Sequence, residues 1–158
     1  MCFDILERSI DTPMTIVTAA NGVERSGCLV GFWTQCSVHP VRCVVMLSKS
    51  NHTYRVARFA PTLAVHVLRE QDVELAERFG AETGDDVDKF AGCRWENGPG
   101  GEPLLVGCPV RLSGRILDRR SLGDHVGFLL EPVAVWAVEP FEPLDIRQAG
   151  GIQPGHPA

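Results

Sequence analysis

The sequence predicts a mainly β domain, an antiparallel β-barrel with two or three short helices added. Three observations lead to this fold class. Five or six stretches of strand length are rich in apolar and β-branched residues, turn residues separate these stretches, and two other segments have the spacing of amphipathic helices. A series of strands joined by turns, with helices between some of them, is typical of a barrel with helical additions.

The first two predicted strands form a hairpin. After a mixed lead-in over residues 2–10, residues 14–20 are rich in β-branched side chains and residues 24–31 form the return strand. The pair Asn21 and Gly22 between them is a strong signal for a hairpin turn, because both residues tolerate the positive backbone angles that such turns need. We therefore expect an antiparallel pair at the start of the barrel.

A buried strand follows at residues 42–48, where the run is almost continuously apolar. Before it, His39 and Pro40 favour extended or turn geometry over helix. The residues just before that pair carry hydroxyl, amide and thiol groups, and we expect them in a loop. They are Thr34, Gln35, Cys36 and Ser37.

A polar segment after this strand opens a helix over residues 53–59. Ser50 and Asn51 are good N-cap residues, and a helix start presents free N–H groups and a partial positive charge to an anion. Lys49 would add a full charge there. A capped helix without any ligand is the alternative interpretation, since capping residues are common.

The next two elements are a strand and a helix. Residues 62–68 alternate as in a strand, and His66 within it is expected to be a hydrogen-bonded strand residue, because no other ligand stands at metal-site spacing. Residues 71–80 place apolar side chains on one face and end at Gly80, as an amphipathic helix does.

The last third of the domain returns to β structure. Glycine and proline punctuate residues 95–103, which we expect to be a loop. Residues 109–117 alternate as a strand, residues 118–122 are expected to turn the chain, and residues 126–138 form a long β-rich run. Pro132 within that run marks an edge, a bulge or a strand boundary.

Composition and charge describe a single ordinary domain. The chain has 158 residues, 44% hydrophobic and 22% charged, enough for a sizeable core. A net charge of -5 gives no electrostatic reason to expect nucleic acid or an anionic membrane surface as partner. Because the N-terminus shows no signal pattern and no apolar run has membrane-spanning length, we expect a cytoplasmic protein.

We expect the domain to occupy residues 1–145, with a flexible tail rich in Pro and Gly over residues 146–158. None of the six cysteines forms a pair at metal-ligand spacing, so no metal site is predicted. Most of them are expected to be small buried residues, and Cys36 is the exception to watch because of its polar surroundings.

Four segments together resemble the flavin reductase-like family, whose fold is the FMN-binding split barrel, an antiparallel Greek-key barrel. Residues 27–31 stand in place of the family's Gly-x-Thr-Ala-Ser, residues 34–37 precede the usual proline at Pro40, and residues 49–53 match the segment before the helix. Gly123, Asp124 and His125 match near the end of the chain.

The resemblance implies a hydride transfer from NADH or NADPH to FMN, with FAD as an alternative, in a homodimer with flavins near its interface. The reduced flavin would then serve a flavin-dependent monooxygenase. The implied flavin-binding residues are Leu29, Val30, Gly31 and Phe32 along the ring; Thr34, Gln35, Cys36 and Ser37 at the ribityl chain; Ser48, Lys49, Ser50, Asn51, His52 and Thr53 around the phosphate; and Lys89 and Phe90.

His125, paired with Asp124, would lie near the nicotinamide, where an imidazole can orient an amide or carry charge. A hairpin histidine whose neighbour merely caps the turn is the other interpretation. The chain departs from the family at residues 29–32, where Leu-Val-Gly-Phe replaces Thr-Ala-Ser-Ser. Because the side-chain hydroxyls of that segment are lost, a deazaflavin-dependent enzyme stays open as an alternative, as does a flavin-binding electron carrier without turnover.

Overall fold

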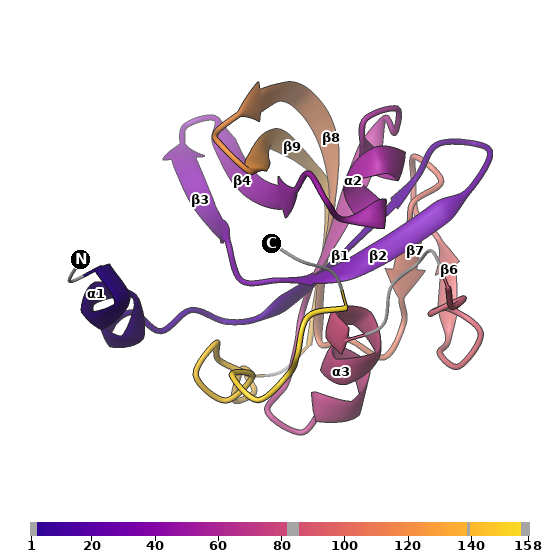
Figure 1. Ribbon diagram of the computed structural model, residues 1–158. Coiled ribbons are helices and arrows are strands. Elements are labelled where there is room, and N and C mark those ends of the chain that lie inside the picture. Colours follow the sequence, from indigo (N-terminus) through magenta and orange to yellow (C-terminus); the bar gives the residue numbers. More distant parts are fainter. Residues whose placement is uncertain (1–2, 82–85, 139, 156–158) are drawn as a thin grey trace.

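A seven-stranded antiparallel sheet forms the body of the protein, in the strand order β2-β1-β5-β8-β9-β4-β3, and two further strands form a small ladder. The computed structural model describes residues 3–81, 86–138 and 140–155 (Figure 1). The elements are α1 (Phe3–Ser9), β1 (Thr15–Ala20), β2 (Arg25–Val30), β3 (Trp33–Val38), β4 (Val41–Ser48), α2 (His52–Ala57), β5 (Thr62–Val67), α3 (Val73–Ala81), β6 (Trp95–Asn97), β7 (Pro103–Leu105), β8 (Val110–Ser121) and β9 (His125–Ala137).

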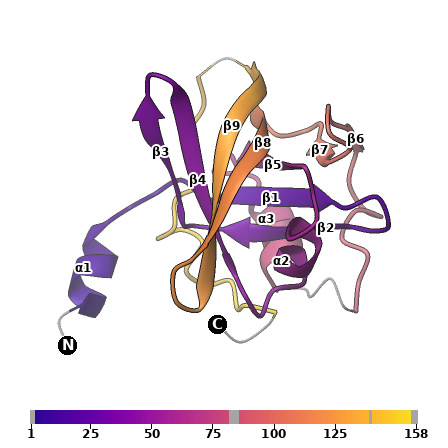
Figure 2. The same cartoon turned by 90° about the horizontal axis from the view of Figure 1, so that it is seen from above.

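The sheet curls so that its two edge strands approach each other. β2 and β3 stand at opposite ends of the strand order, yet only Gly31 and Phe32 connect them in the chain. Figure 2 shows β1 and β2 running across the view while β3, β4 and β9 stand steeply against them. Within the described residues no ladder joins β2 to β3, so the predicted barrel is confirmed as a curled sheet that is open beside this link.

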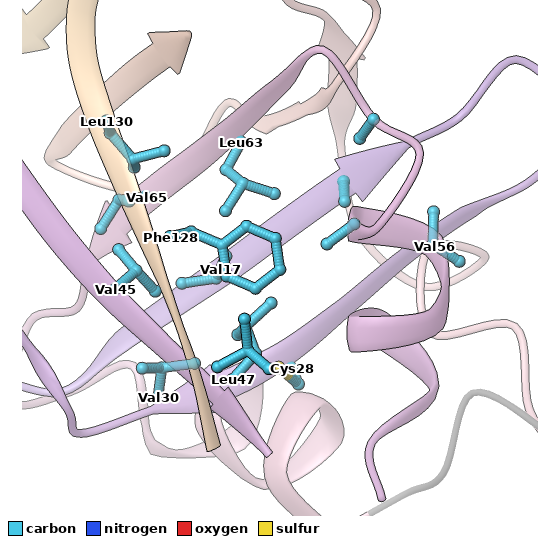
Figure 3. Packing of buried hydrophobic residues seen from close by; sticks show 14 residues of the cluster. Val17, Cys28, Val30, Val45, Leu47, Val56, Leu63, Val65, Phe128 and Leu130 are labelled. Carbon is cyan, nitrogen blue, oxygen red and sulfur yellow. The ribbon is translucent and has the colours of Figure 1, made fainter. Parts of the chain in front are cut away.

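The main core fills the inside of the curled sheet. Phe128 of β9 is fully buried and packs among Val17, Val45, Leu63 and other aliphatic side chains from both halves of the sheet (Figure 3). α2 covers one end of this core with Val56 and Ala57. The alternation of apolar residues along the strands therefore predicts the inner face correctly.

A second core cluster lies between the sheet and α3. Phe79 of α3 packs against Phe90, with ring centroids 5.4 Å apart, and Leu144 and Ala149 join the same cluster. Ile146 and Ile152 pack against it as well. Residues 146–155, which the composition assigns to a loose tail, instead lie against the body of the protein, while residues 156–158 are outside the described part.

Several expected element boundaries differ from the structure. Residues 34–37 are not a loop but belong to edge strand β3, where pairing with β4 alone leaves polar side chains in solvent. The expected loop at 95–103 begins and ends in the β6–β7 ladder. The lead-in contains α1, and β8 continues to Ser121, so the turn falls at Gly123, whose φ is 117°.

Pro132 sits at a β-bulge. Ser113 pairs with Ala134 and Gly114 with Pro132, which leaves Val133 as the extra residue of β9. Of the three interpretations of this proline, the bulge is therefore confirmed. The strand runs on through it to Ala137, and the main sheet has more strands than the five or six expected.

Two buried polar side chains join the small ladder to the main sheet. His66 of β5 has Nδ1 2.9 Å from the carbonyl oxygen of Ile16, and the N–H of Leu105 donates to its Nε2 at 3.0 Å. Glu102 accepts hydrogen bonds from the hydroxyls of Thr62 and Ser113. His66 is thus confirmed as a hydrogen-bonded strand histidine, and burial lowers its pKa to about 4.

Among the described residues, no helix combines the length and the apolar character needed to cross a bilayer.

Candidate functional site

A pocket of about 310 Å³ opens where the two edges of the sheet approach each other. Its walls come from the end of β2, the link at Gly31 and Phe32, the end of β4, the start of α2, the end of α3 and the C-terminal segment. This volume lies at the lower end of the range typical of small-molecule sites, roughly 300–1,000 Å³. The open edge of the barrel therefore carries a concave site.

The pocket brings together many of the residues expected at the site. Those that line it are Leu29, Val30, Gly31, Phe32, Ser48, Asn51, His52, Lys89 and His125. The expected residues outside its lining are Thr34, Gln35, Cys36, Ser37, Lys49, Ser50, Thr53, Phe90 and Asp124. Segments that lie far apart in the sequence thus meet at one cavity.

The polar side of the pocket is built at the start of α2. Asn51 has an extended backbone, and its Oδ1 accepts a hydrogen bond from the N–H of Thr53 at 2.8 Å, which makes it the N-cap. The hydroxyls of Ser48 and Ser50 are 2.9 Å apart. Thr53 is expected at the phosphate, but its side chain is fully buried. Its hydroxyl lies 2.9 Å from that of Ser26, so it connects the start of α2 to β2.

His52 is held from both sides of its ring. Arg55 Nη2 lies 3.0 Å from Nδ1, and Glu24 Oε2 lies 3.2 Å from Nε2. Because a guanidinium can only donate, Nδ1 accepts and Nε2–H donates to the carboxylate. The neutral tautomer with its proton on Nε2 fits both contacts, and the imidazole forms a fixed part of the wall.

His125 faces the same pocket from the start of β9. Its Nδ1 lies 2.8 Å from Asp124 Oδ1, and this hydrogen bond holds the pKa of the Asp124 carboxyl below its usual value. The imidazole also contacts the ring of Phe32, with centroids 5.4 Å apart. The carboxylate and the phenyl ring together fix the plane of the imidazole at the pocket edge.

The two lysines occupy different positions. Lys49 is exposed and donates from Nζ to the hydroxyl of Ser121 at 2.7 Å, beside the pocket and not inside it. Lys89 is buried, and its Nζ donates to the carbonyls of Gly27 at 2.9 Å and Phe79 at 3.0 Å. Lys89 thereby joins β2 to α3 and brings positive charge to the pocket.

The loop expected at the ribityl chain is not part of the lining. Thr34, Gln35 and Cys36 are exposed on β3, and the strand carries a bulge between Gln35 and Ser37. Phe90 likewise points into the second core, where its ring packs at 5.9 Å from that of Trp95. None of these side chains lines the pocket.

Sequence reasoning missed one complete wall of the pocket. The C-terminal segment contributes Ile146, Ala149, Gly150, Ile152 and Pro154 to the lining. Glycine and proline dominate this stretch and suggest a loose tail. The two isoleucines were the available signal, since large aliphatic side chains in such a stretch favour packing onto the body of a protein.

The lining suits a flat aromatic ligand with a polar or anionic extension. Phe32, Met46, Leu47 and Ile146 give it apolar walls, and Ser48 and Asn51 supply hydrogen-bonding groups at one end. A flavin has this combination of an aromatic ring system and a phosphate. The residues present therefore fit a flavin, even though residues 29–32 carry no side-chain hydroxyl.

Comparison with known proteins agrees with this fit. The family model described as "Flavin reductase like domain" matches residues 7–149. The reductase component of 4-hydroxyphenylacetate 3-monooxygenase from Salmonella typhimurium is 28% identical over 125 residues, which cover 77% of this chain and 72% of that protein. The FMN reductase (NADH) RutF from Stutzerimonas stutzeri is 31% identical over 103 residues, 64% of this chain and 59% of that protein.

Solved structures show the same fold. The NADH:FAD oxidoreductase SgcE6 of Streptomyces globisporus superposes with a TM-score of 0.83 at 24% identity, covering 94% of this chain and 92% of that one. A flavin reductase domain protein from Arthrobacter sp. FB24 also has a TM-score of 0.83, at 25% identity, covering 99% and 94%. The open, curled sheet is thus the split barrel that the family resemblance implies.

Proposed function

We propose that this chain, which belongs to the flavin reductase-like family, transfers hydride from NADH or NADPH to a flavin. The observation that carries the proposal is the pocket at the open edge of the barrel, where residues from β2, β4, α2 and β9 meet around a space suited to an aromatic ligand. FMN is the leading flavin and FAD the alternative. Relatives named as an FMN reductase (NADH) and as an NADH:FAD oxidoreductase support both.

A bound flavin supplies the redox chemistry, because its ring accepts a hydride that no side chain of the protein can take up. The side chains of the protein bind the flavin and orient it. Ser48 and Asn51 are placed to hydrogen-bond a phosphate, and Lys49 adds positive charge beside them. Both ring nitrogens of His52 are already engaged, so its imidazole forms part of the wall. Apolar walls exclude water from the ring.

His125 is the candidate for contact with the nicotinamide. The hydrogen bond to Asp124 holds the ring orientation, so the imidazole edge is presented to the pocket in one fixed position. An imidazole so held can hydrogen-bond the carboxamide of a nicotinamide and stabilise charge that develops during hydride transfer. His125 would then act on the reductant, whereas the α2 end of the pocket acts on the flavin.

We further propose that the reduced flavin passes to a flavin-dependent monooxygenase. The support is the naming of relatives as reductase components or subunits of such oxygenases, including HsaB of Rhodococcus jostii, which is 29% identical over 72% of this chain and 57% of that protein. A homodimer would cover apolar surface that is exposed in the single chain, notably Phe3, Ile5 and Leu6 of α1. The five cysteines within the described residues are free thiols, which supports the cytoplasm, where thiols stay reduced.

The test is steady-state oxidation of NADH and of NADPH by the purified protein, with FMN, FAD or a deazaflavin as acceptor. The proposal expects turnover that depends on added flavin and saturates with FMN or FAD. Turnover with the deazaflavin alone would move the function to that cofactor. Flavin binding without turnover would make the protein a carrier, and no binding of any of the three would end the proposal.

A further inference from the structure

We infer that Ile146 and Ile152 of the C-terminal segment form the wall that determines how tightly the flavin is held. The inference rests on the proposed function and goes beyond it, because it assigns retention of the flavin to two side chains that the resemblance does not include. Both side chains line the pocket together with groups from β2 and α3. Ile152 also lies outside residues 7–149, the part that the family model matches.

Each isoleucine is seated against a glycine. A Cβ atom on Gly31 would come within 3.1 Å of Ile146 Cδ1, and a Cβ on Gly80 would come within 3.1 Å of Ile152 Cγ2. Distances this short are tighter than ordinary contacts between aliphatic carbons, which lie near 3.5–4.0 Å. The absence of side chains at Gly31 and Gly80 therefore lets the two isoleucines approach the body of the protein closely.

Backbone hydrogen bonds hold the segment at both ends. The N–H of Ile146 donates to the carbonyl of Thr12 at 2.9 Å, and the N–H of Gly155 donates to the carbonyl of Gly80 at 3.1 Å. Between them, the N–H of Ile152 donates to the carbonyl of Ala149 at 2.9 Å. Figure 1 shows this yellow segment passing beside α3. These backbone hydrogen bonds thus hold the two isoleucines in place.

The position of these side chains suits contact with a ring system. Phe32 and Met46 line the pocket from the β3–β4 side of the sheet, whereas Ile146 and Ile152 come from the C-terminal segment. An aromatic ring between such walls is removed from water over much of its apolar area, which favours its binding. The phosphate and the nicotinamide are assigned to other residues, at the start of α2 and at His125. Loss of the isoleucine wall should therefore weaken retention of the flavin ring without changing recognition of the nicotinamide.

The experiment measures FMN binding to the full chain by quenching of flavin fluorescence, for the wild type, Ile146→Ala and Ile152→Ala. Each substitution is expected to raise the dissociation constant about ten-fold or more, because a missing methylene in an apolar pocket costs roughly 10–200-fold. The release rate of FMN should rise by a similar factor, while the KM for NADH stays the same. Ile152→Leu, which keeps the volume, should restore tight binding.

Val23→Ala is the matched control, because Val23 is 93% exposed in the first hairpin and does not line the pocket. It should bind FMN as the wild type does. Thermal melting without ligand identifies any variant that fails to fold, and Ile146→Val then replaces Ile146→Ala. Unchanged FMN affinity in the folded isoleucine variants, with a wild type that binds FMN, overturns this inference alone. A wild type that binds no flavin overturns the proposed function instead.

Discussion

The buried His66 should lower the free energy of unfolding of the protein in acid, because its imidazole has to take up a proton there. Burial lowers the pKa of His66 from 6.5 to about 4 in the folded protein, and the unfolded chain keeps the ordinary value. Between these two values the unfolded state binds a proton that the folded state does not, so the free energy of unfolding falls as the pH falls. The stability that depends on a neutral His66 is therefore fully present above pH 6.5 and is lost as the pH falls to about 4.

The size of the effect follows from the two pKa values. At about 1.4 kcal/mol for each pH unit, the interval from 6.5 to about 4 corresponds to roughly 3 kcal/mol. The contacts give the physical reason. Nε2 accepts the N–H of Leu105, and a proton on Nε2 would place two donors face to face in a site without water access.

Urea unfolding followed by tryptophan fluorescence, at a series of pH values from neutral to about pH 4, measures this loss. His66→Gln is the comparison, because glutamine cannot take up a proton in this range. The variant should be less stable at neutral pH by about 1–3 kcal/mol, yet lose roughly 3 kcal/mol less than the wild type on acidification. Equal losses in the two proteins would refute the assignment to His66.

Three further substitutions test other parts of the structure. Glu102→Ala leaves the hydroxyls of Thr62 and Ser113 without their acceptor and should lower the free energy of unfolding by about 3–5 kcal/mol in urea titrations, with Glu102→Gln in between. His125→Ala should raise the KM for NADH without changing the FMN dissociation constant; a reversed pattern would contradict its role. Asn51→Ala removes the cap of α2 and should cost about 1 kcal/mol, and a neutral result would contradict the capping contact.

Local chemistry predicted those parts of the fold that depend on neighbouring residues. Asn21 and Gly22 indicate the first hairpin, and the structure places Gly22 at φ 88° with Asn21 Oδ1 accepting two backbone N–H groups. The capping preference of Asn51 predicts the start of α2 to within a residue. The apolar run at 42–48 predicts β4, but not its environment: Cys43, Val45 and Leu47 are buried, whereas Val44 and Met46 on the other face are only partly buried. The strand is therefore covered on one face and not on both, as a continuous apolar run would suggest.

Long-range packing decided what the sequence could not show. Whether polar residues such as Thr34 and Gln35 form a loop or an edge strand depends on a partner strand, here β4, and not on their own side chains. The C-terminal wall depends on Gly31 and Gly80, which lie far away in the sequence and leave room for the two isoleucines. The partner strand and the two glycines are not visible within a local window of the chain, where the aliphatic character of the two isoleucines is the available signal.

The family resemblance predicts which segments lie near one another, and the structure shows which of their side chains meet. Ser48, Asn51, His52 and His125 line one pocket, and their contact with a flavin stays a prediction. Thr53, in contrast, is buried beneath the helix because its hydroxyl meets that of Ser26. A motif thus identifies the segment, while the direction of each side chain follows from the helix phase and the strand pleat.

Anaerobic mixing of the protein with FMN and NADH, followed through the visible absorbance of the flavin, tests the central claim most directly. The flavin absorbance is expected to bleach at a rate that depends on the protein and that is lower with His125→Ala than with the wild type. If the flavin binds and stays oxidised with both NADH and NADPH, the pocket described here is not the site of hydride transfer.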